Sequence, residues 1–359
     1  MKIAIGSKFI EGPYGGGNSF IKNLSSYLEL KGHKVVNTLV DRDIDIMLLT
    51  NPLFDSEHTT FNHLDIKNYQ TKVNKLALSV QRINECDERK NTNHVNKGII
   101  NSNINIDHTV FVSSWLKDLY IKKGIKNKNI SVILAGADSK IFNSISKRKW
   151  DGSTKIKLVT HHWSDNWMKG FGIYQTIDEM LSSKKWSDRL SFTYIGNYPK
   201  ELNFKNTNLI KPLGNRELAE ELKKHHIYIT GSLNEPSGNH HIEAFQCKLP
   251  VLYIDSGGIS EYCEKYGLEY DRDSLAYKLN YLIDNYDAYY KKLENYDLSA
   301  DKMSKEFLDL FEKLYAIKND ISENRQLPSS IYTYSQKMNF QIKRLFNKTS
   351  FKFKKFFSK

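Results

Sequence analysis

The sequence predicts an α/β protein made of two domains, each with a parallel sheet packed between helices. Short runs rich in β-branched and aromatic residues alternate with segments of helical periodicity, which is typical of parallel sheets with crossover helices. The length of 359 residues is enough for two domains of ordinary size. The polar stretch 143–154 divides the chain and is typical of a linker.

The first series of elements begins with a strand at 2–6, followed by a glycine-rich loop and a helix. Asn18 is the expected cap of this helix, whose apolar residues share one face and which ends at Gly32. The glycines before it, including Gly16 and Gly17, allow the backbone to approach a ligand closely, and a mere flexible turn is the alternative. Their spacing is not that of a dinucleotide-binding loop, so NAD is not expected. Further strands are expected at 35–38, 45–50, 76–80, 109–113 and 130–134, with a helix at 114–124.

The second series contains strands at 155–160, 190–196, 208–212, 227–230 and 250–254. The expected helices are 171–181, 216–225 with Asn215 as its cap, one from about residue 241, 274–293 and 300–317.

The stretch 227–262 contains the densest set of chemically informative residues. Glu235 follows a strand and Glu243 lies on the first turns of the next helix, so both carboxylates face one crevice. The amides of Gly238, Asn239 and His240 lie between them, at a helix N-terminus that suits a phosphate. A helix N-terminus that suits a phosphate, next to carboxylates that can bind sugar hydroxyls, is typical of a site for a nucleotide sugar. The alternative is a loop charge at Glu235 and a solvated Glu243.

This stretch resembles the donor-binding core of retaining GT-B glycosyltransferases, in family 4 and its relatives. Their Glu-x7-Glu motif matches Glu235 and Glu243, and their Gly-Gly-Ile-x-Glu motif matches residues 257–261. The resemblance implies a GT-B fold, with two Rossmann-like doubly wound domains facing a cleft. It implies that Glu243 holds the nucleotide ribose and Glu235 faces the transferred sugar. It also implies that Ser256, Gly257 and Gly258 lie beside the nucleotide or sugar.

The same resemblance assigns Lys169, in a Lys-Gly pair at a helix start, to the donor diphosphate. A lysine there supplies positive charge to the leaving group without a metal. No Asp-x-Asp motif at a strand end accompanies the phosphate loop, so no metal or other cofactor is expected. The family's usual arginine is absent, and His161 and His162 stand there instead. We expect a structural or substrate-binding role for this pair, with His162, Gly16 and Gly17 on the donor side.

The segment 81–89 leaves the strand 76–80 and is a candidate crevice loop. Family members place a histidine near here, whereas this chain has Arg82 and Asn84. We assign these two residues to the acceptor, with Arg82 contacting an acidic acceptor. A surface ion pair of Arg82 with Glu85 or Glu88 is the alternative.

The expected domains are residues 1–148 for the acceptor and 149–299 for the nucleotide sugar. By resemblance, a helix at 300–325 crosses back to the first domain. Residues 326–359 form a tail with eight Lys or Arg and no acid, which leaves +4 of the net charge of +12 for the rest. Six phenylalanines lie among the cations, so we expect the tail to bind an anionic membrane surface. A nucleic-acid arm and a solubilising tail are the alternatives.

Three cysteines, Cys86, Cys247 and Cys263, match no zinc or disulfide spacing, which favours a reducing compartment. The first residues lack the apolar region of a signal peptide, and no apolar run has the length of a membrane span. The expected location is therefore the cytoplasm, at the inner face of the membrane.

The predicted reaction moves a sugar from a nucleoside-diphosphate sugar to a hydroxyl of a saccharide or lipid-linked saccharide. Retention follows from the resemblance, as does a role in bacterial surface polysaccharide synthesis. The alternatives are a nucleic-acid-binding protein, another GT-B chemistry such as a phosphorylase or epimerase, and a catalytically silent scaffold. The modest charge of the first 325 residues disfavours nucleic acid as a partner.

Overall fold

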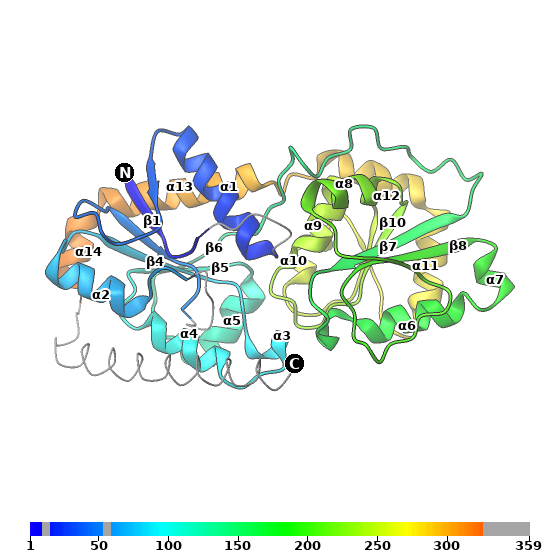
Figure 1. Ribbon diagram of the computed structural model, residues 1–359, viewed down its shortest axis with the longest axis horizontal. Coiled ribbons are helices and arrows are strands. Elements are labelled where there is room, and N and C mark those ends of the chain that lie inside the picture. The colour runs from blue at the N-terminus through cyan, green and yellow to red at the C-terminus, as the bar shows by residue number, and fades with distance from the viewer. Residues whose placement is uncertain (9–14, 53–58, 326–359) are drawn as a thin grey trace, which may run out of the picture.

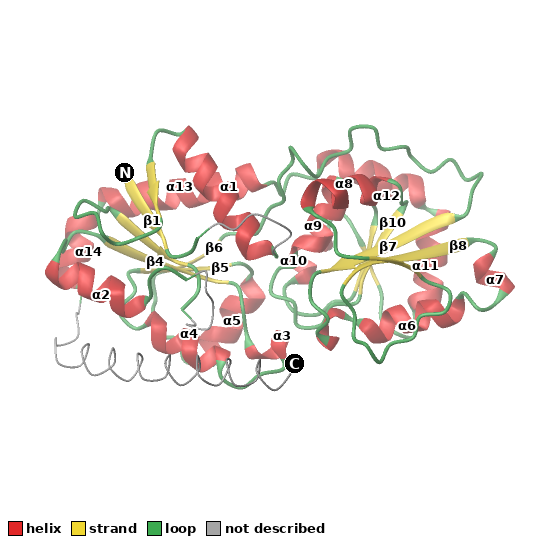
Figure 2. Cartoon of the chain, viewed as in Figure 1, coloured by secondary structure: helices red, strands yellow, loops and turns green. Residues whose placement is uncertain are grey.

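The protein has two lobes side by side, each with a twisted sheet between helices (Figures 1 and 2). The computed structural model describes residues 1–8, 15–52 and 59–325. The basic tail and the start of the glycine-rich loop lie outside the described residues. Among the described helices, none is both long enough and apolar enough to cross a membrane.

The first lobe contains a parallel sheet of six strands in the order β2-β1-β3-β4-β5-β6. The strands are β1 (Lys2–Ile5), β2 (Lys34–Val36), β3 (Ile46–Leu49), β4 (Leu78–Ile83), β5 (His108–Phe111) and β6 (Ile130–Val132). The helices are α1 (Gly16–Leu30), α2 (His63–Lys72), α3 (Asp87–Lys90), α4 (Val95–Asn103) and α5 (Ser114–Lys122).

The second lobe contains another parallel sheet of six strands, in the order β12-β11-β10-β7-β8-β9. The strands are β7 (Ile156–His162), β8 (Leu190–Gly196), β9 (Asn208–Ile210), β10 (Ile227–Thr230), β11 (Val251–Tyr253) and β12 (Leu268–Glu269). The helical elements are η1 (Trp167–Lys169), α6 (Phe171–Met180), α7 (Lys184–Ser187), α8 (Asn215–Lys223), α9 (Asn239–Gln246), α10 (Ile259–Cys263), α11 (Leu275–Asp284), α12 (Tyr286–Lys292), η2 (Leu293–Asn295), α13 (Ala300–Ala316) and α14 (Lys318–Asn324).

The strand order of each sheet reverses at one position. In the second sheet the chain moves outward through β7, β8 and β9 and then returns to place β10 on the other side of β7. In the first sheet the corresponding reversal lies between β1 and β3. Ligands of open α/β sheets bind outside the carboxyl ends of the strands at such reversals. The topology therefore predicts that ligands bind near the ends of β7 and β10.

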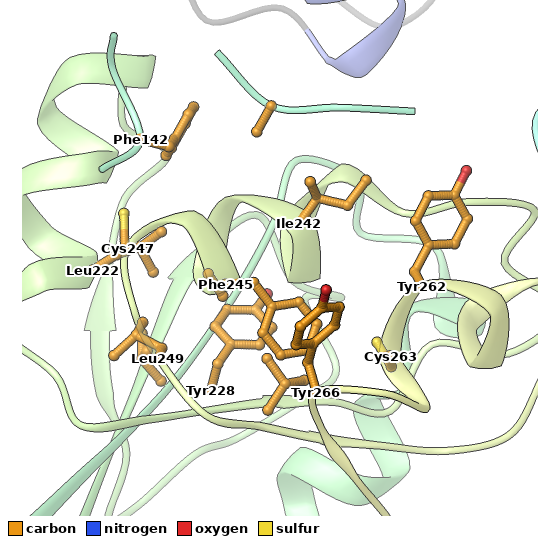
Figure 3. Close-up of a cluster of buried hydrophobic side chains, with 14 of the residues drawn as sticks. Phe142, Leu222, Tyr228, Ile242, Phe245, Cys247, Leu249, Tyr262, Cys263 and Tyr266 are labelled. Atoms are coloured by element: carbon orange, nitrogen blue, oxygen red, sulfur yellow. The ribbon is translucent and has the colours of Figure 1, made fainter. Parts of the chain in front are cut away.

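Helix α9 is fixed by a buried apolar cluster beneath it (Figure 3). Ile242 and Phe245 are 0% and 1% exposed, and they pack with Tyr228 of β10, Leu249 and Tyr266. Each fully buried side chain of this size contributes roughly 1.5–3 kcal/mol. The N-terminus of α9 therefore has a fixed position relative to β10.

Helix α13 leaves the second lobe and packs against α1 of the first (Figure 1). Its buried residues Met303, Phe307 and Phe311 join the core of the first sheet. The rings of Phe20 and Phe307 meet edge to face with centroids 5.3 Å apart. The two chain crossings between the lobes also touch, because the Ala300 amide donates to the Ala137 carbonyl at 2.8 Å. The two segments that pass between the lobes thus lie side by side.

Several element boundaries differ from those expected from the sequence. Asn18 and Asn215 lie inside their helices, whose N-caps are Gly15 and Gly214. The segment 274–293 is two helices that meet at Asn285. Helix α9 begins at Asn239, two residues before the expected start.

Strands β4 and β7 are longer than predicted. Strand β4 continues to Ile83, because residues 80–83 pair with β5 and residues 78–81 with β3, and all six of its residues are buried. Arg82 therefore belongs to a strand and not to a crevice loop. Strand β7 likewise continues through His161 and His162, which pair with β8.

Candidate active site

A cleft of about 450 Å³ opens where the carboxyl ends of the two sheets face each other. The first lobe contributes Gly15, Gly16, Gly17, Asn18, Ser19, Arg82, Asn84, Glu85 and Arg89 to its lining. The second lobe contributes His161, His162, Trp163, Ser164, Lys169, Ile195, Gly196, Pro212, Leu213, Asn215, Leu218, Glu235, Ser237, Gly238, Asn239, His240 and Glu243.

Lys169 is held at the cleft by the tight junction between η1 and α6. Gly170, which follows it, has φ of +91°, and a Cβ there would overlap the backbone of Gly231. Only glycine combines this left-handed conformation with so close a backbone approach. The Leu233 amide donates to the Met168 carbonyl at 2.8 Å, which joins the exits of β7 and β10. Lys169 and the loop after β10 are therefore positioned together.

Glu235 lies in that loop, with its carboxylate between two cations. Its Oε2 accepts from Lys169 Nζ at 2.5 Å, and its Oε1 accepts from Arg89 Nε at 3.0 Å. Arg89 is on α3 of the first lobe, so Glu235 connects the lobes. Burial favours the neutral acid, but the charges of Arg89 and Lys169 outweigh it and hold the pKa of Glu235 well below its usual range. Glu235 is an anion at neutral pH and can only accept hydrogen bonds.

Glu243 lies on α9, eight residues after Glu235, and faces the same cleft. Its Oε2 is 2.8 Å from Nε2 of His161 at the end of β7. The His161 backbone amide donates to the Tyr228 hydroxyl at 3.1 Å, which fixes that end of the strand. The carboxylate of Glu243 is thus oriented from β7, and Glu243 lines the cleft.

His162 and His240 are buried beside Lys169 and are neutral. Burial lowers the pKa of both rings well below 6.5, and the nearby charge of Lys169 adds to the effect. His162 Nε2 lies 2.6 Å from the Tyr174 hydroxyl, and His240 Nε2 lies 2.8 Å from Thr230 Oγ1. Neutral rings do not replace the cation that a second arginine would supply. Among the described residues, no group of three His, Cys, Asp or Glu side chains is placed to hold a metal ion.

The helix N-termini of the two lobes meet across the cleft. Gly238 caps α9 with φ of +73°, and Gly15 caps α1. A Cβ on Gly16 would lie 2.7 Å from Nδ2 of Asn239, so a larger residue at position 16 would displace the Asn239 side chain. Gly16, Gly17, Gly238, Asn239 and His240, all predicted from the sequence, therefore lie together.

Ser256, Gly257 and Gly258 do not appear among the described residues that line the cleft. They lie behind Glu235 and support its backbone. The Gly258 amide donates to the Glu235 carbonyl at 2.9 Å, and Ser256 Oγ accepts from the Asn234 amide at 2.8 Å. A Cβ on Gly257 would overlap the backbone of Glu235. In this structure the loop fixes Glu235 from behind.

Arg82 and Asn84, which we assigned to the acceptor, both line the first-lobe side of the cleft. The alternative of an ion pair between Arg82 and Glu85 or Glu88 does not occur. Arg89 and Lys90 contact Glu85, whereas Lys123 contacts Glu88. The Arg82 guanidinium instead lies 4.0 Å from the ring centroid of Phe20.

Arg89 is the main residue that the sequence reasoning missed. It belongs to the segment 81–89, which we identified as a candidate crevice loop, so its position at the cleft could have been predicted. Its pairing with Glu235 could not, because the two residues are 146 positions apart and no local sequence pattern indicates the contact. Trp163, which is 47% exposed at the cleft, was also missed.

Comparison with known protein families gives a match that lies within the second lobe. Residues 197–300 match the family "Glycosyl transferases group 1". No curated protein sequence matches the chain. The matched segment contains β9 to η2 and the whole Glu235 to Glu243 unit.

Solved structures similar to the whole chain include three of comparable size. Sucrose-phosphate synthase from Thermosynechococcus elongatus has a TM-score of 0.62 at 14% identity, covering 88% of this chain and 99% of that one. A glycosyltransferase from Rickettsia africae has 0.62 at 14% identity, covering 87% and 98%. HepE from Anabaena, in complex with UDP and glucose, has 0.64 at 13% identity, covering 88% and 100%.

These similarities confirm the predicted fold class, two Rossmann-like parallel-sheet domains in the GT-B arrangement. With the match over residues 197–300, they support a glycosyltransferase. A similarity at 12–18% sequence identity supports the fold only, so the substrates of this chain must be inferred from its own residues.

Proposed function

We propose that this protein transfers a sugar from a nucleoside-diphosphate sugar to a hydroxyl of a saccharide or lipid-linked saccharide, with retention of configuration. The observation that carries the proposal is the carboxylate pair of Glu235 and Glu243 at the N-terminus of α9, with Lys169 beside it. HepE, which shares the fold, is solved with UDP-glucose.

The nucleoside would occupy the part of the cleft at the exits of β8 and β9. Ile195, Pro212, Leu213 and Leu218 give this part an apolar lining that suits a nucleobase. Glu243 lines the same cleft. A ribose beside it would donate hydrogen bonds from its hydroxyl groups to the Glu243 carboxylate, which His161 already orients.

The diphosphate would lie against Lys169 and the first amides of α9. An unpaired helix N-terminus and a buried ammonium both favour negative charge. Arg89 adds a second cation from the first lobe, through its contact with Glu235. Glu235 holds both cations in this structure, so a diphosphate would compete with Glu235 for them.

The reaction breaks the bond between the anomeric carbon and the phosphate oxygen and forms a bond from the acceptor oxygen to that carbon. The acceptor proton passes to the departing diphosphate, on the same face of the sugar. Lys169, Arg89 and the α9 amides stabilise the charge that develops on the leaving group. Glu235 accepts hydrogen bonds from the sugar hydroxyls and orients the ring. No step requires a metal, since Lys169 supplies the positive charge.

The test is a screen of UDP-, GDP- and ADP-sugars for binding and hydrolysis, using the wild type, Glu243→Ala and Glu235→Gln. Glu243→Ala should weaken nucleotide binding about tenfold or more, because it removes a charged acceptor for the ribose. Glu235→Gln should keep nucleotide binding within about threefold and lower turnover about a hundredfold. Wild-type kcat/KM in both variants would show that the carboxylates are misassigned.

Retention and the cellular role are parts of the proposal with their own readouts. The anomeric proton coupling of the first-formed product, observed by NMR, distinguishes retention from inversion. We propose surface polysaccharide synthesis at the inner face of a bacterial membrane, and binding of the full chain to anionic liposomes tests the membrane location. Dependence of turnover on orthophosphate would favour a phosphorylase, and a product that stays nucleotide-bound would favour an epimerase.

A further inference from the structure

Arg82 is a buried cation for which the described part of the chain provides no anionic partner. It is 7% exposed, in the middle of the first sheet at the end of β4. No ion pair or side-chain hydrogen bond joins its guanidinium to a described residue. The guanidinium instead makes a cation–π contact with the face of the Phe20 ring. Its open side faces the cleft, which it lines.

A buried charge without a partner destabilises the folded protein unless a bound ligand of opposite charge neutralises it. Burial lowers the pKa of Arg82 to about 10, so the guanidinium is still charged at neutral pH. An unpaired buried charge destabilises a fold, and buried arginines are ordinarily paired. Other arginines in this part of the protein follow this rule, since Arg325, with a side chain 3% exposed, binds Asp107 at 2.7 Å, and the more exposed Arg89 binds two glutamates. Arg82 is the exception among them, and it faces the cleft.

The surroundings of Arg82 add positive potential and do not neutralise it. Phe20, on which Arg82 stacks, lies in the second turn of α1, and the N-terminal residues Gly16 and Gly17 of that helix line the same cleft. The N-cap Gly15 offers no side chain to the first amides of this 15-residue helix. Glu85 also lines the cleft, but Arg89 and Lys90 engage its carboxylate.

We propose that Arg82, beside the N-terminal part of α1, binds a phosphate group carried by the acceptor, so that Gly16 and Gly17 of this helix face the acceptor as well as the donor. The proposal rests on the proposed function, because the phosphate belongs to the molecule whose hydroxyl receives the sugar. The guanidinium group and the helix amides together offer more N–H donors than the two oxygens of a carboxylate accept. A phosphate group has three or more acceptor oxygens and therefore suits this set of donors better. The subsite is on the first lobe, across the cleft from Lys169.

The experiment titrates inorganic phosphate into the full chain by calorimetry. It is run alone and with saturating amounts of whichever of UDP, GDP or ADP binds. We expect phosphate to bind in both cases, and Arg82→Met to weaken it at least about tenfold. Arg82→Lys should be intermediate, because it keeps the charge and loses the fork. Arg42→Gln, which removes an exposed arginine in the same lobe, is the matched control and should bind as the wild type does.

Thermal unfolding of the same proteins separates loss of the subsite from loss of the fold. Arg82→Met keeps a flexible side chain over Phe20 and removes an unpaired charge, so without ligand it should melt at or above the wild-type temperature. Phosphate should raise the midpoint of the wild type and leave that of Arg82→Met unchanged.

Three results of the phosphate titration would overturn the proposal: no phosphate binding to the wild type, equal binding to Arg82→Met, or displacement of phosphate by the nucleotide. Failure of nucleotides to bind would contradict the proposed function and still leave the phosphate titration readable. Glycerol phosphate and a short-chain phosphatidate then distinguish a soluble from a lipid-borne phosphate. Binding of either supports the proposal, and binding of neither contradicts it.

Discussion

At the scale of residues, the central feature is a carboxylate shared by a cation from each lobe. Glu235 binds Lys169 and Arg89 at once, although these residues come from different sheets. Truncating one partner of a buried charged pair leaves the other charge exposed to an apolar environment, which typically costs several kcal/mol. The same two cations are the charges available to a diphosphate, so they link ligand binding to the contact between the lobes.

Arg89→Gln should lower kcat/KM for the sugar donor by about tenfold to a hundredfold, equivalent to roughly 1–3 kcal/mol. The reason is the loss of one of two cations at the leaving group. Lys90→Gln is the matched control. Lys90 is the residue after Arg89 and also contacts Glu85, at 3.1 Å, but it is not among the described residues that line the cleft. Steady-state kinetics of both variants would contradict this role if Arg89→Gln retained the activity of Lys90→Gln.

Sequence reasoning located the residues whose role depends on a local motif. Glu235, Glu243, Lys169 and the glycines at both helix N-termini all lie at one cleft. It misjudged residues whose surroundings are set by tertiary structure. Arg89 gained its partner from a segment 146 residues away. Arg82 looked like a loop residue because polar neighbours concealed a strand paired on both sides.

At the scale of elements, the two segments that cross between the lobes depend on a close backbone contact. Residue 137 bridges to residue 299, and a Cβ on Gly136 would overlap the Ser299 carbonyl. This contact places α13 on α1 and holds the second lobe against the first. The crossing is therefore where the geometry of the cleft is set.

Gly136→Ala should destabilise the protein by about 1–3 kcal/mol, since the added methyl group must push two backbones apart. Gly172→Ala is the control with the opposite sign. Gly172 lies within α6, and its Cβ would meet Arg272 only at an ordinary 3.5 Å, so alanine should stabilise by roughly 0.5–1 kcal/mol. Urea unfolding measures both changes, and an unchanged midpoint for Gly136→Ala would contradict the account of the crossing.

Strands with a continuous apolar run were predictable, and β8 and β10 begin and end where the sequence indicated. Boundaries set by tertiary contacts were not. Helices α2, α3, α4, α7, α10 and α14 were not identified individually. Gly15 and Gly214 cap helices without a side-chain oxygen, so the nearby asparagines were more conspicuous as caps than the true ones.

At the scale of the whole molecule, buried histidines make the fold sensitive to mild acid. Burial lowers the pKa of His108 and His225 to about 4 and that of His241 to about 3. The unfolded chain binds protons at these side chains from about pH 6.5 downward, whereas the folded chain does not until about pH 4. Protonation therefore favours unfolding throughout this window.

Each such histidine lowers stability by up to about 1.4 kcal/mol per pH unit, so these three alone should lower the free energy of unfolding by roughly 3–6 kcal/mol between pH 7 and pH 5. Glu235 has the opposite dependence: its stabilising charge is complete above its ordinary pKa of 4.5 and is lost only at lower pH. Denaturant titrations at pH 7, 6 and 5 measure the effect. A stability that stays constant over this range would contradict the assignment of these rings as neutral.

The tail at 326–359 remains a prediction from the sequence. We expect the full chain to float with liposomes that contain phosphatidylglycerol, and a chain that ends at Leu327 to lose this binding. The shortened chain keeps Arg325, which binds Asp107 at 2.7 Å, so its fold should be intact. Each cation contributes roughly 1 kcal/mol at an anionic surface, and neutral lipid is the control. Equal flotation of the two chains would refute a membrane role for the tail.

The most direct test of the account measures whether Lys169 binds a diphosphate without a metal. UDP, GDP and ADP are titrated in excess EDTA into the wild type, Lys169→Met and the exposed-lysine control Lys224→Met. We predict that at least one nucleotide binds to the wild type and to Lys224→Met, and that Lys169→Met loses about tenfold or more of that affinity. Binding that requires manganese, or that is unchanged in Lys169→Met, would contradict the account.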